Sequence, residues 1–159
     1  GFAIGTAAAS LAGQYLGAGN LRMARRSVLM CTAIAMIFMA LIGVAFVCLG
    51  RPLTQVISAD PGHLDLVPKL LLICGVTQVF FAVSMVVRQA LRGVGDTTWT
   101  FIITTVSSYG IRLPAAWILG VTLGWGLPGI WMGLCGEIAI RATLFFIRFQ
   151  HGGWSRRVV

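Results

Sequence analysis

The longest uncharged stretch of the chain is SVLMCTAIAMIFMALIGVAFVCLG, residues Ser27–Gly50, which lies between Arg26 and Arg51. As an α-helix, its 24 residues would extend about 36 Å at a rise of about 1.5 Å per residue. The hydrocarbon core of a bilayer is about 30 Å thick, so such a helix is long enough to cross it. The stretch therefore predicts a membrane span and indicates the class of fold.

The composition of the whole chain supports this interpretation. Of the 159 residues, 58% are hydrophobic before the 20 glycines are counted, whereas a soluble domain has about 45 to 50% with glycine included. Charged residues make up 10%, against about 25% in soluble domains. A soluble domain of about 150 residues buries only about 70% of its surface on folding. The composition therefore excludes a disordered chain, a coiled coil, and a water-exposed enzyme or nucleic-acid binder standing alone.

Three further stretches predict complete spans: Leu70–Val87, about Thr98–Leu119 and about Leu127–Phe149. A segment of small apolar residues from Gly1 to about Leu16 predicts the end of a truncated helix. Every backbone amide in lipid needs an internal partner, and no alternating strand pattern is visible, so the spans are expected to be helical. We therefore expect an all-α polytopic membrane bundle with four complete transmembrane helices plus the end of a truncated one. Pro114 predicts a bend in the third span.

The cations are distributed unevenly among the segments that join the spans. Eight lie in alternate segments, namely Arg22, Arg25, Arg26, Arg88, Arg92, Arg148, Arg156 and Arg157, and only Arg51 and Lys69 lie in the other connecting segments. The positive-inside rule then predicts a multi-pass protein of the inner (plasma) membrane with a cytoplasmic C-terminus. The net charge of +8 thus reflects membrane topology, and no nucleic-acid partner is expected.

Two of the connecting segments resemble each other across 75 residues: QYLGAGN at Gln14–Asn20 and QALRGVGD at Gln89–Asp96. Each has glycines that can end a helix in the left-handed conformation, followed by Asn or Asp as a helix N-cap. The similarity is compatible with an internal repeat or with two ordinary tight turns. The segment Arg51–Pro68, which contains several prolines, predicts an irregular or partly interfacial loop.

No pattern typical of an enzyme or of a cofactor site is present. The glycines of both connecting segments follow membrane helices rather than strands, so a phosphate-binding loop is not predicted. The four cysteines lie in apolar runs without a CxxC motif, and we interpret them as helix-packing residues rather than metal or disulfide partners. They are Cys31, Cys48, Cys74 and Cys135.

Three charges fall inside the predicted spans: Arg112, Glu137 and Arg141. A charge near the centre of a bilayer costs about 2.5 to 3.5 kcal/mol on insertion scales. Glu137 and Arg141 are i, i+4 neighbours, and folding the last two spans back near Leu123 predicts that Arg112 also reaches Glu137. This network has two interpretations: a proton-linked carboxylate, or a counter-ion of two arginines. The second is favoured because two nearby cations stabilise the ionised carboxylate.

Polar and soft side chains recur on one face of the second complete span, which suits a wall that accepts varied amphipathic ligands. Ordinary helix packing is the alternative interpretation. The candidates for the substrate cavity are Thr77, Gln78, Phe81, Ser84 and Met85, together with Thr6 and Ser10 in the first segment.

The chain resembles the C-terminal part of transporters of the multidrug and toxic compound extrusion (MATE) family. The similar segments are Thr6–Arg26, Gln89–Thr97, Tyr109–Ala116, Gly126–Gly133 and Arg148–Phe149 followed by Gly153–Trp154. Their order, spacing and predicted sidedness agree along essentially the whole chain. The resemblance implies twelve helices in two six-helix lobes around a central cavity. It also implies antiport, in which a proton or sodium gradient drives export of amphipathic, often cationic, organic compounds.

On this resemblance, residues 1–159 would be part of the C-terminal lobe, without the N-terminal lobe and without the first helix of their own lobe. The implied partners are a small amphipathic organic substrate, H⁺ or Na⁺, the lipid bilayer and the missing lobe. Some members carry an acidic residue for sodium coupling on the helix that corresponds to Leu70–Val87, which has none here. Proton coupling through the missing lobe is therefore favoured. A flippase for lipid-linked saccharides and a membrane scaffold subunit without transport are the alternatives.

Overall fold

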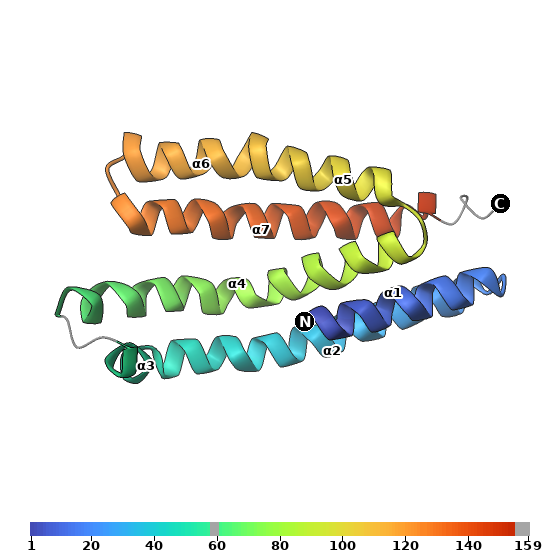
Figure 1. Ribbon diagram of the computed structural model, residues 1–159, viewed down its shortest axis with the longest axis horizontal. Helices are drawn as coiled ribbons and strands as arrows, with labels where there is room; N and C mark the ends of the chain where they lie inside the picture. Colours follow the sequence, from blue (N-terminus) through green and yellow to red (C-terminus); the bar gives the residue numbers. More distant parts are fainter. Residues whose placement is uncertain (58–60, 155–159) are drawn as a thin grey trace.

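The computed structural model describes residues 1–57 and 61–154, and every regular element within them is a helix (Figure 1). The helices are α1 (Phe2–Gly17), α2 (Leu21–Cys48), α3 (Gly50–Ile57), α4 (Pro61–Gly93), α5 (Thr97–Thr105), the π-helical η1 (Val106–Arg112), α6 (Leu113–Trp117), the π-helical η2 (Ile118–Thr122) and α7 (Gly126–Gln150). Four are long and apolar enough to cross a membrane: Leu21–Cys48, Leu66–Gly93, Thr97–Thr122 and Gly126–Gln150. The predicted all-α membrane bundle is confirmed.

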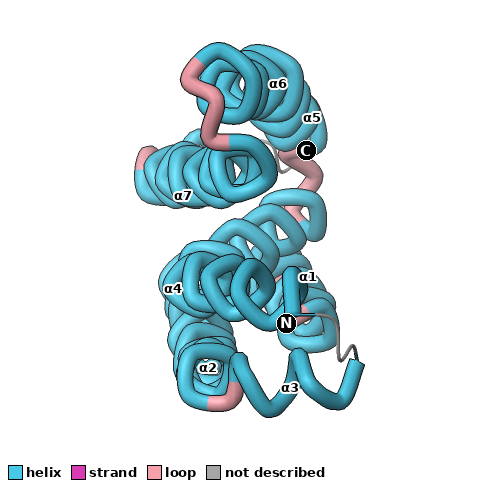
Figure 2. The backbone as a smooth tube through the Cα atoms, turned by 90° about the vertical axis from the view of Figure 1, so that its left-hand side faces the viewer, coloured by secondary structure: helices cyan, strands magenta, loops and turns pink. Residues whose placement is uncertain are grey.

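The long helices lie side by side with α4 at the centre of the packing (Figures 1 and 2). Helix α4 packs against α1, α2 and α7, while α7 packs against the helix formed by α5, η1, α6 and η2. The α1–α2 turn, the α4–α5 turn and the end of α7 lie at the same end of the bundle in Figure 1. The segments predicted to carry most of the cations therefore gather at one end, as the predicted alternation requires.

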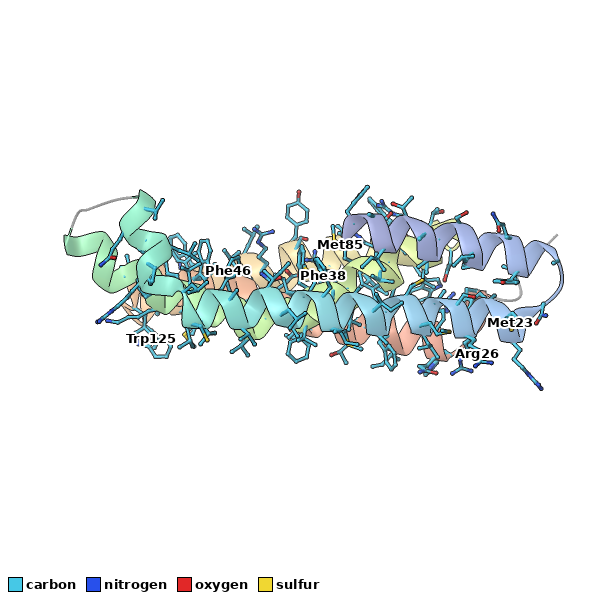
Figure 3. All side chains as sticks on the ribbon, turned by 90° about the horizontal axis from the view of Figure 1, so that it is seen from below. Met23, Arg26, Phe38, Phe46, Met85 and Trp125 are labelled. Carbon is cyan, nitrogen blue, oxygen red and sulfur yellow. The ribbon has the colours of Figure 1, made fainter. Side chains whose placement is uncertain are left out.

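The outward faces of the spans carry large apolar side chains that protein does not cover. On α2, Ile37, Phe38 and Leu41 are 64%, 57% and 65% exposed. In Figure 3, Phe38 lies along the middle of this helix, with Arg26 towards one end of the bundle and Trp125 towards the other. Lipid is the medium that accommodates such a surface, because it solvates apolar side chains without the free-energy cost that water imposes.

The two similar connecting segments adopt the same turn. The φ angles of Gly19 and Gly95 are +73° and +80°, a region that favours glycine. The backbone N–H of Asn20 donates to the carbonyl of Tyr15 at 2.8 Å, and the N–H of Asp96 donates to the carbonyl of Leu91 at 2.9 Å. Each glycine N–H also donates to the carbonyl three residues before it. This pattern is the Schellman motif, and it ends α1 and α4 in the same way.

The connecting segments are shorter than the sequence predicted. Residues Ala18–Asn20 and Val94–Asp96 alone separate the helices at these two turns. The arginines that the sequence placed in these connecting segments therefore lie within helices, because the caps allow helix to begin and end immediately beside the glycines. Arg22, Arg25 and Arg26 lie in the first turns of α2, and Arg88 and Arg92 lie within α4.

The prediction of an irregular loop over Arg51–Pro68 was wrong for most of that segment. Helix α3 includes Pro52, and Pro61 is the first residue of α4, where a proline removes no helical hydrogen bond. Only residues 58–60 lie outside the described part of the chain here. Helix α3 crosses the end of the bundle roughly perpendicular to the long helices, as an interfacial segment would (Figures 1 and 2).

Pro114 does not interrupt the third span, which continues from Thr97 to Thr122. Two π-helical segments, η1 and η2, lie on either side of the proline. In a π-helix the hydrogen bonds run from residue i to residue i+5, which gives a wider turn. In a regular α-helix, the ring of Pro114 would clash with the carbonyl group four residues before it. That carbonyl group belongs to Gly110, which lies in the wider turns of η1.

Two glycines allow the backbones of α2 and α4 to touch. A Cβ atom on Gly43 would overlap the carbonyl oxygen of Gly75, and a Cβ atom on Gly75 would lie 2.7 Å from the carbonyl oxygen of Gly43. Helices in lipid gain little from the hydrophobic effect when they associate, because lipid tails are also apolar. Close contact between the two backbones supplies van der Waals attraction in place of the hydrophobic effect.

We predict that Gly43→Ala destabilises the bundle, because the added methyl group must separate α2 from α4. Overpacking of this kind costs about 1 to 3 kcal/mol. The thermal unfolding midpoint of the protein in detergent is the measurement. Gly136→Ala is the matched control, since a Cβ atom at this helical position in α7 would have no neighbour within 4 Å. Equal midpoints for the two variants would contradict the close contact.

Candidate functional site

A cavity of about 180 Å³ lies between α4 and α7. Its lining residues are Cys74, Thr77, Gln78 and Phe81 of α4 with Cys135 and Ile138 of α7. Three of the five candidates on this helix, Thr77, Gln78 and Phe81, therefore share one cavity. A mostly apolar wall with a few polar groups is typical of a binding site, but small-molecule sites usually measure about 300 to 1,000 Å³. The cavity has the size of one part of a larger site.

The polar groups of the cavity differ in what they offer a ligand. The hydroxyl of Thr77 donates to the carbonyl oxygen of Ile73 at 2.7 Å, so it faces a ligand as an acceptor. Gln78 is half-buried and carries an amide that both donates and accepts. Phe81 is also half-buried and adds an aromatic face. Together they suit an amphipathic molecule better than a strongly charged one.

The structure does not bring Ser84 and Met85 into this cavity. Ser84 is 5% exposed and belongs to the packed interior. The sulfur of Met85 lies 3.4 Å from the position that a Cβ atom of Gly1 would take, and the side chain of Met39 also borders that position. Met85 therefore packs beside the start of α1, where Figure 3 also places it. Both residues border other parts of the bundle, and the expectation that they line a substrate cavity stays a prediction.

Thr6 and Ser10 are exposed on α1 and do not line the α4–α7 cavity. The hydroxyl of Thr6 donates to the carbonyl oxygen of Phe2 at 3.2 Å, and the amide nitrogen of Gln14 donates to the hydroxyl oxygen of Ser10 at 3.4 Å. Gln14 thus extends the exposed polar stripe of α1 by one helical turn. The sequence reasoning missed this residue as a candidate, although its four-residue spacing from Ser10 could have indicated it.

The predicted charge network forms only in part. Arg141 Nε lies 3.3 Å from Glu137 Oε1, and the Glu137 side chain is 1% exposed. Arg112 is exposed and has no ion pair within the described residues. The prediction counted residues along an ideal α-helix, but Arg112 ends the π-helical η1, in which each residue turns through a smaller angle. Arg112 therefore lies on a different face from the one that the count suggested.

A second ion pair, between Asp96 and Arg148, joins the α4–α5 turn to the end of α7. Arg148 Nε donates to Asp96 Oδ2 at 2.9 Å, and Asp96 is fully buried. The Arg148 guanidinium also lies 4.8 Å from the centre of the Trp99 ring. Sequence reasoning missed this pair, although both residues belong to the segments Gln89–Thr97 and Arg148–Phe149. No local spacing could have linked positions that lie 52 residues apart.

The turn after α7 is attached to the same region. Trp154 Nε1 donates to the carbonyl oxygen of Phe149 at 2.9 Å, and the two aromatic rings stack with their centres 5.3 Å apart. Trp154 is 1% exposed. This packing fixes the end of α7 beside the Asp96–Arg148 pair, so it serves the structure of the bundle rather than a ligand.

Comparison with known proteins gives matches along most of the chain. Residues 1–118 match the model of the MatE family. Over 158 residues, which are 99% of this chain and 34% of the relative, the chain is 30% identical to a probable multidrug resistance protein NorM of Thermotoga maritima. It is 28% identical over 98% of its length to multidrug and toxin extrusion protein 2 of Mus musculus, covering 27% of that protein. It is also 30% identical over 93% of its length to a multidrug resistance protein NorM of Burkholderia vietnamiensis, covering 33% of it.

We predict that Asp96→Ala lowers the stability of the bundle by about 3 to 5 kcal/mol, because it leaves Arg148 without its buried counter-ion. Thermal unfolding in detergent is again the measurement. Asn20→Ala is the matched control at the equivalent turn, where the side chain only accepts a capping hydrogen bond from the Met23 N–H at 3.1 Å. Loss of a cap costs about 1 kcal/mol. If the control were the more damaging substitution, the structural role of the ion pair would be refuted.

Proposed function

Because the chain belongs to the MatE family, whose model matches residues 1–118, we propose that it forms part of a secondary active exporter of amphipathic or cationic organic compounds. The family resemblance predicted from the separate segments is confirmed, and the chain is an integral multi-pass membrane protein. The observation that carries the proposal is the match of nearly the whole chain to relatives named for multidrug resistance or extrusion. The chain spans about a third or less of the length of these relatives.

Residues 1–159 are, in this proposal, part of the C-terminal lobe of the exporter. The bundle of four spans and α1 would pack against the first helix of the same lobe and work with an N-terminal lobe. Alternating access moves one half of a transporter against the other, so transport belongs to the complete protein. The cluster of Arg22, Arg25, Arg26, Arg92 and Arg148 at one end of the bundle supports a cytoplasmic C-terminus in the inner membrane.

The substrate would meet two surfaces of this chain: the α4–α7 cavity and the exposed stripe of α1. Gln78 offers hydrogen bonds, while Phe81 offers the aromatic face that attracts organic cations. Phe81 and Met85 are four residues apart on α4, and Met85 contacts the start of α1. One face of α4 therefore leads from the cavity towards the helix that carries Thr6 and Ser10.

Coupling to protons would be carried by the N-terminal lobe, because the carboxylates of this chain are poorly placed for it. The span Leu66–Gly93 contains no carboxylate. The two buried carboxylates in the described residues, Asp96 and Glu137, each have an arginine beside them. Each of these carboxylates already serves as the counter-ion of an arginine. The proton-linked group would then lie in the N-terminal lobe.

Ethidium efflux from cells that express the complete protein tests the function. We expect efflux that exceeds the background of cells without the protein and that a proton uncoupler abolishes. A flippase or a scaffold subunit would leave the dye in the cells whether or not the uncoupler is present. That result would refute the export proposal.

The cavity is tested with Gln78→Ala and Phe81→Ala in the same assay. We expect the efflux rate at matched expression to fall about tenfold, because each substitution removes about 1 to 2 kcal/mol of ligand contact. Val76→Ala is the control, since Val76 lies on another face of α4 and is 64% exposed. Efflux equal to that of the control would argue that the cavity does not contact the substrate.

Glu137→Gln distinguishes a structural carboxylate from a proton-linked one. The variant leaves Arg141 as a poorly neutralised cation inside the bundle, so we predict a reduced yield of folded protein. Transport per folded molecule should stay close to that of the parent. The measurements are the monodisperse fraction in detergent and efflux at matched expression. A normally folded variant without transport would show that Glu137 carries protons.

A further inference from the structure

Two cysteines that lie 61 positions apart meet inside the bundle. Cys74 of α4 and Cys135 of α7 both line the α4–α7 cavity. The two thiols lie close enough to interact. Both thiols are half-buried and free. The sequence suggested only packing roles for them, because neither has a cysteine or histidine near it along the chain.

One hydrogen bond already links the sulfur atom of Cys74 to α7, since Trp131 Nε1 donates to Cys74 Sγ at 3.0 Å. The thiolate is the form of cysteine that binds metal ions, and metal binding releases the thiol proton. The cavity of about 180 Å³ gives an ion access to both sulfur atoms.

The number of ligands selects the kind of ion. Among the described residues, no group of three or more His, Cys, Asp or Glu side chains could hold a metal ion. Structural zinc sites need four protein ligands, so this pair does not suit zinc. Soft thiolate ligands bind preferentially to soft metal ions. Ions such as Hg²⁺ and Ag⁺ can be coordinated by only two sulfur atoms, in a linear arrangement.

We propose that Cys74 and Cys135 form a two-coordinate binding site for a thiophilic metal ion between α4 and α7. Binding of Hg²⁺ forms two sulfur–mercury bonds and releases the two thiol protons, with no change of oxidation state. The bound ion bridges two helices whose packing shapes the α4–α7 cavity. The site lies wholly within this chain and does not depend on the proposed transport function.

Mercury binding to the reduced protein in detergent tests the site, and Hg²⁺ is the probe. The parent protein for this test carries Cys31→Ala and Cys48→Ala, which removes the two single thiols of α2. Binding is followed by the ultraviolet absorption of the mercury–thiolate bonds while glutathione competes for the ion. We expect either Cys74→Ser or Cys135→Ser to weaken binding by at least about 100-fold, because a second tethered ligand raises avidity by that order.

Each serine variant must first show the helical content and elution volume of its parent. Serine keeps a hydrogen-bonding atom at either position, so folded variants are expected. Binding that is as tight with one remaining thiol as with two would overturn the proposal.

A second measurement does not depend on the variants. In the parent protein, one bound Hg²⁺ should protect both Cys74 and Cys135 from maleimide labelling, as counted by peptide mass. Protection of one thiol for each bound ion would also overturn the proposal.

Discussion

Every backbone amide in the four spans must find its hydrogen-bond partner within its own helix, because hydrocarbon offers none. The continuity of the span from Thr97 to Thr122 illustrates this constraint, since π-helical turns on either side of Pro114 carry the helix past the proline. The same constraint makes the ends of helices important. The two Schellman turns at Gly19 and Gly95 satisfy the last carbonyls of α1 and α4 and allow the next helix to begin almost at once.

Different faces of helix α4 contact different neighbouring helices. Gly75 brings it against α2, Met85 contacts the start of α1, and the face with Cys74, Gln78 and Phe81 borders the cavity with α7. The central helix thus carries both the close contacts that hold the bundle together and the side chains that a ligand would meet. A change in the α4–α7 packing would change the cavity, which is why a metal ion bound by both helices is of mechanistic interest.

Two buried carboxylates of the described residues lie within ion-pair distance of arginines. Asp96 and Glu137 are buried, and each lies beside an arginine of α7. In a medium of low dielectric, an unpaired carboxylate would be costly, and the nearby guanidinium reduces this cost. The polar side chains that line the α4–α7 cavity, such as Gln78, are uncharged.

The number and approximate position of the spans, the two glycine turns, the gathering of cations at one end and the family were all predictable from the sequence. These properties depend on hydropathy, local turn chemistry and short motifs, all of which are determined by residues that lie close together along the chain. Which helix faces meet was decided only by the tertiary structure. The rotation of each helix about its axis depends on backbone contacts such as Gly43–Gly75 and on the π-helical turns that moved Arg112 away from Glu137. For the same reason the pairs Asp96–Arg148 and Cys74–Cys135 join residues whose spacing along the chain carries no signal of contact.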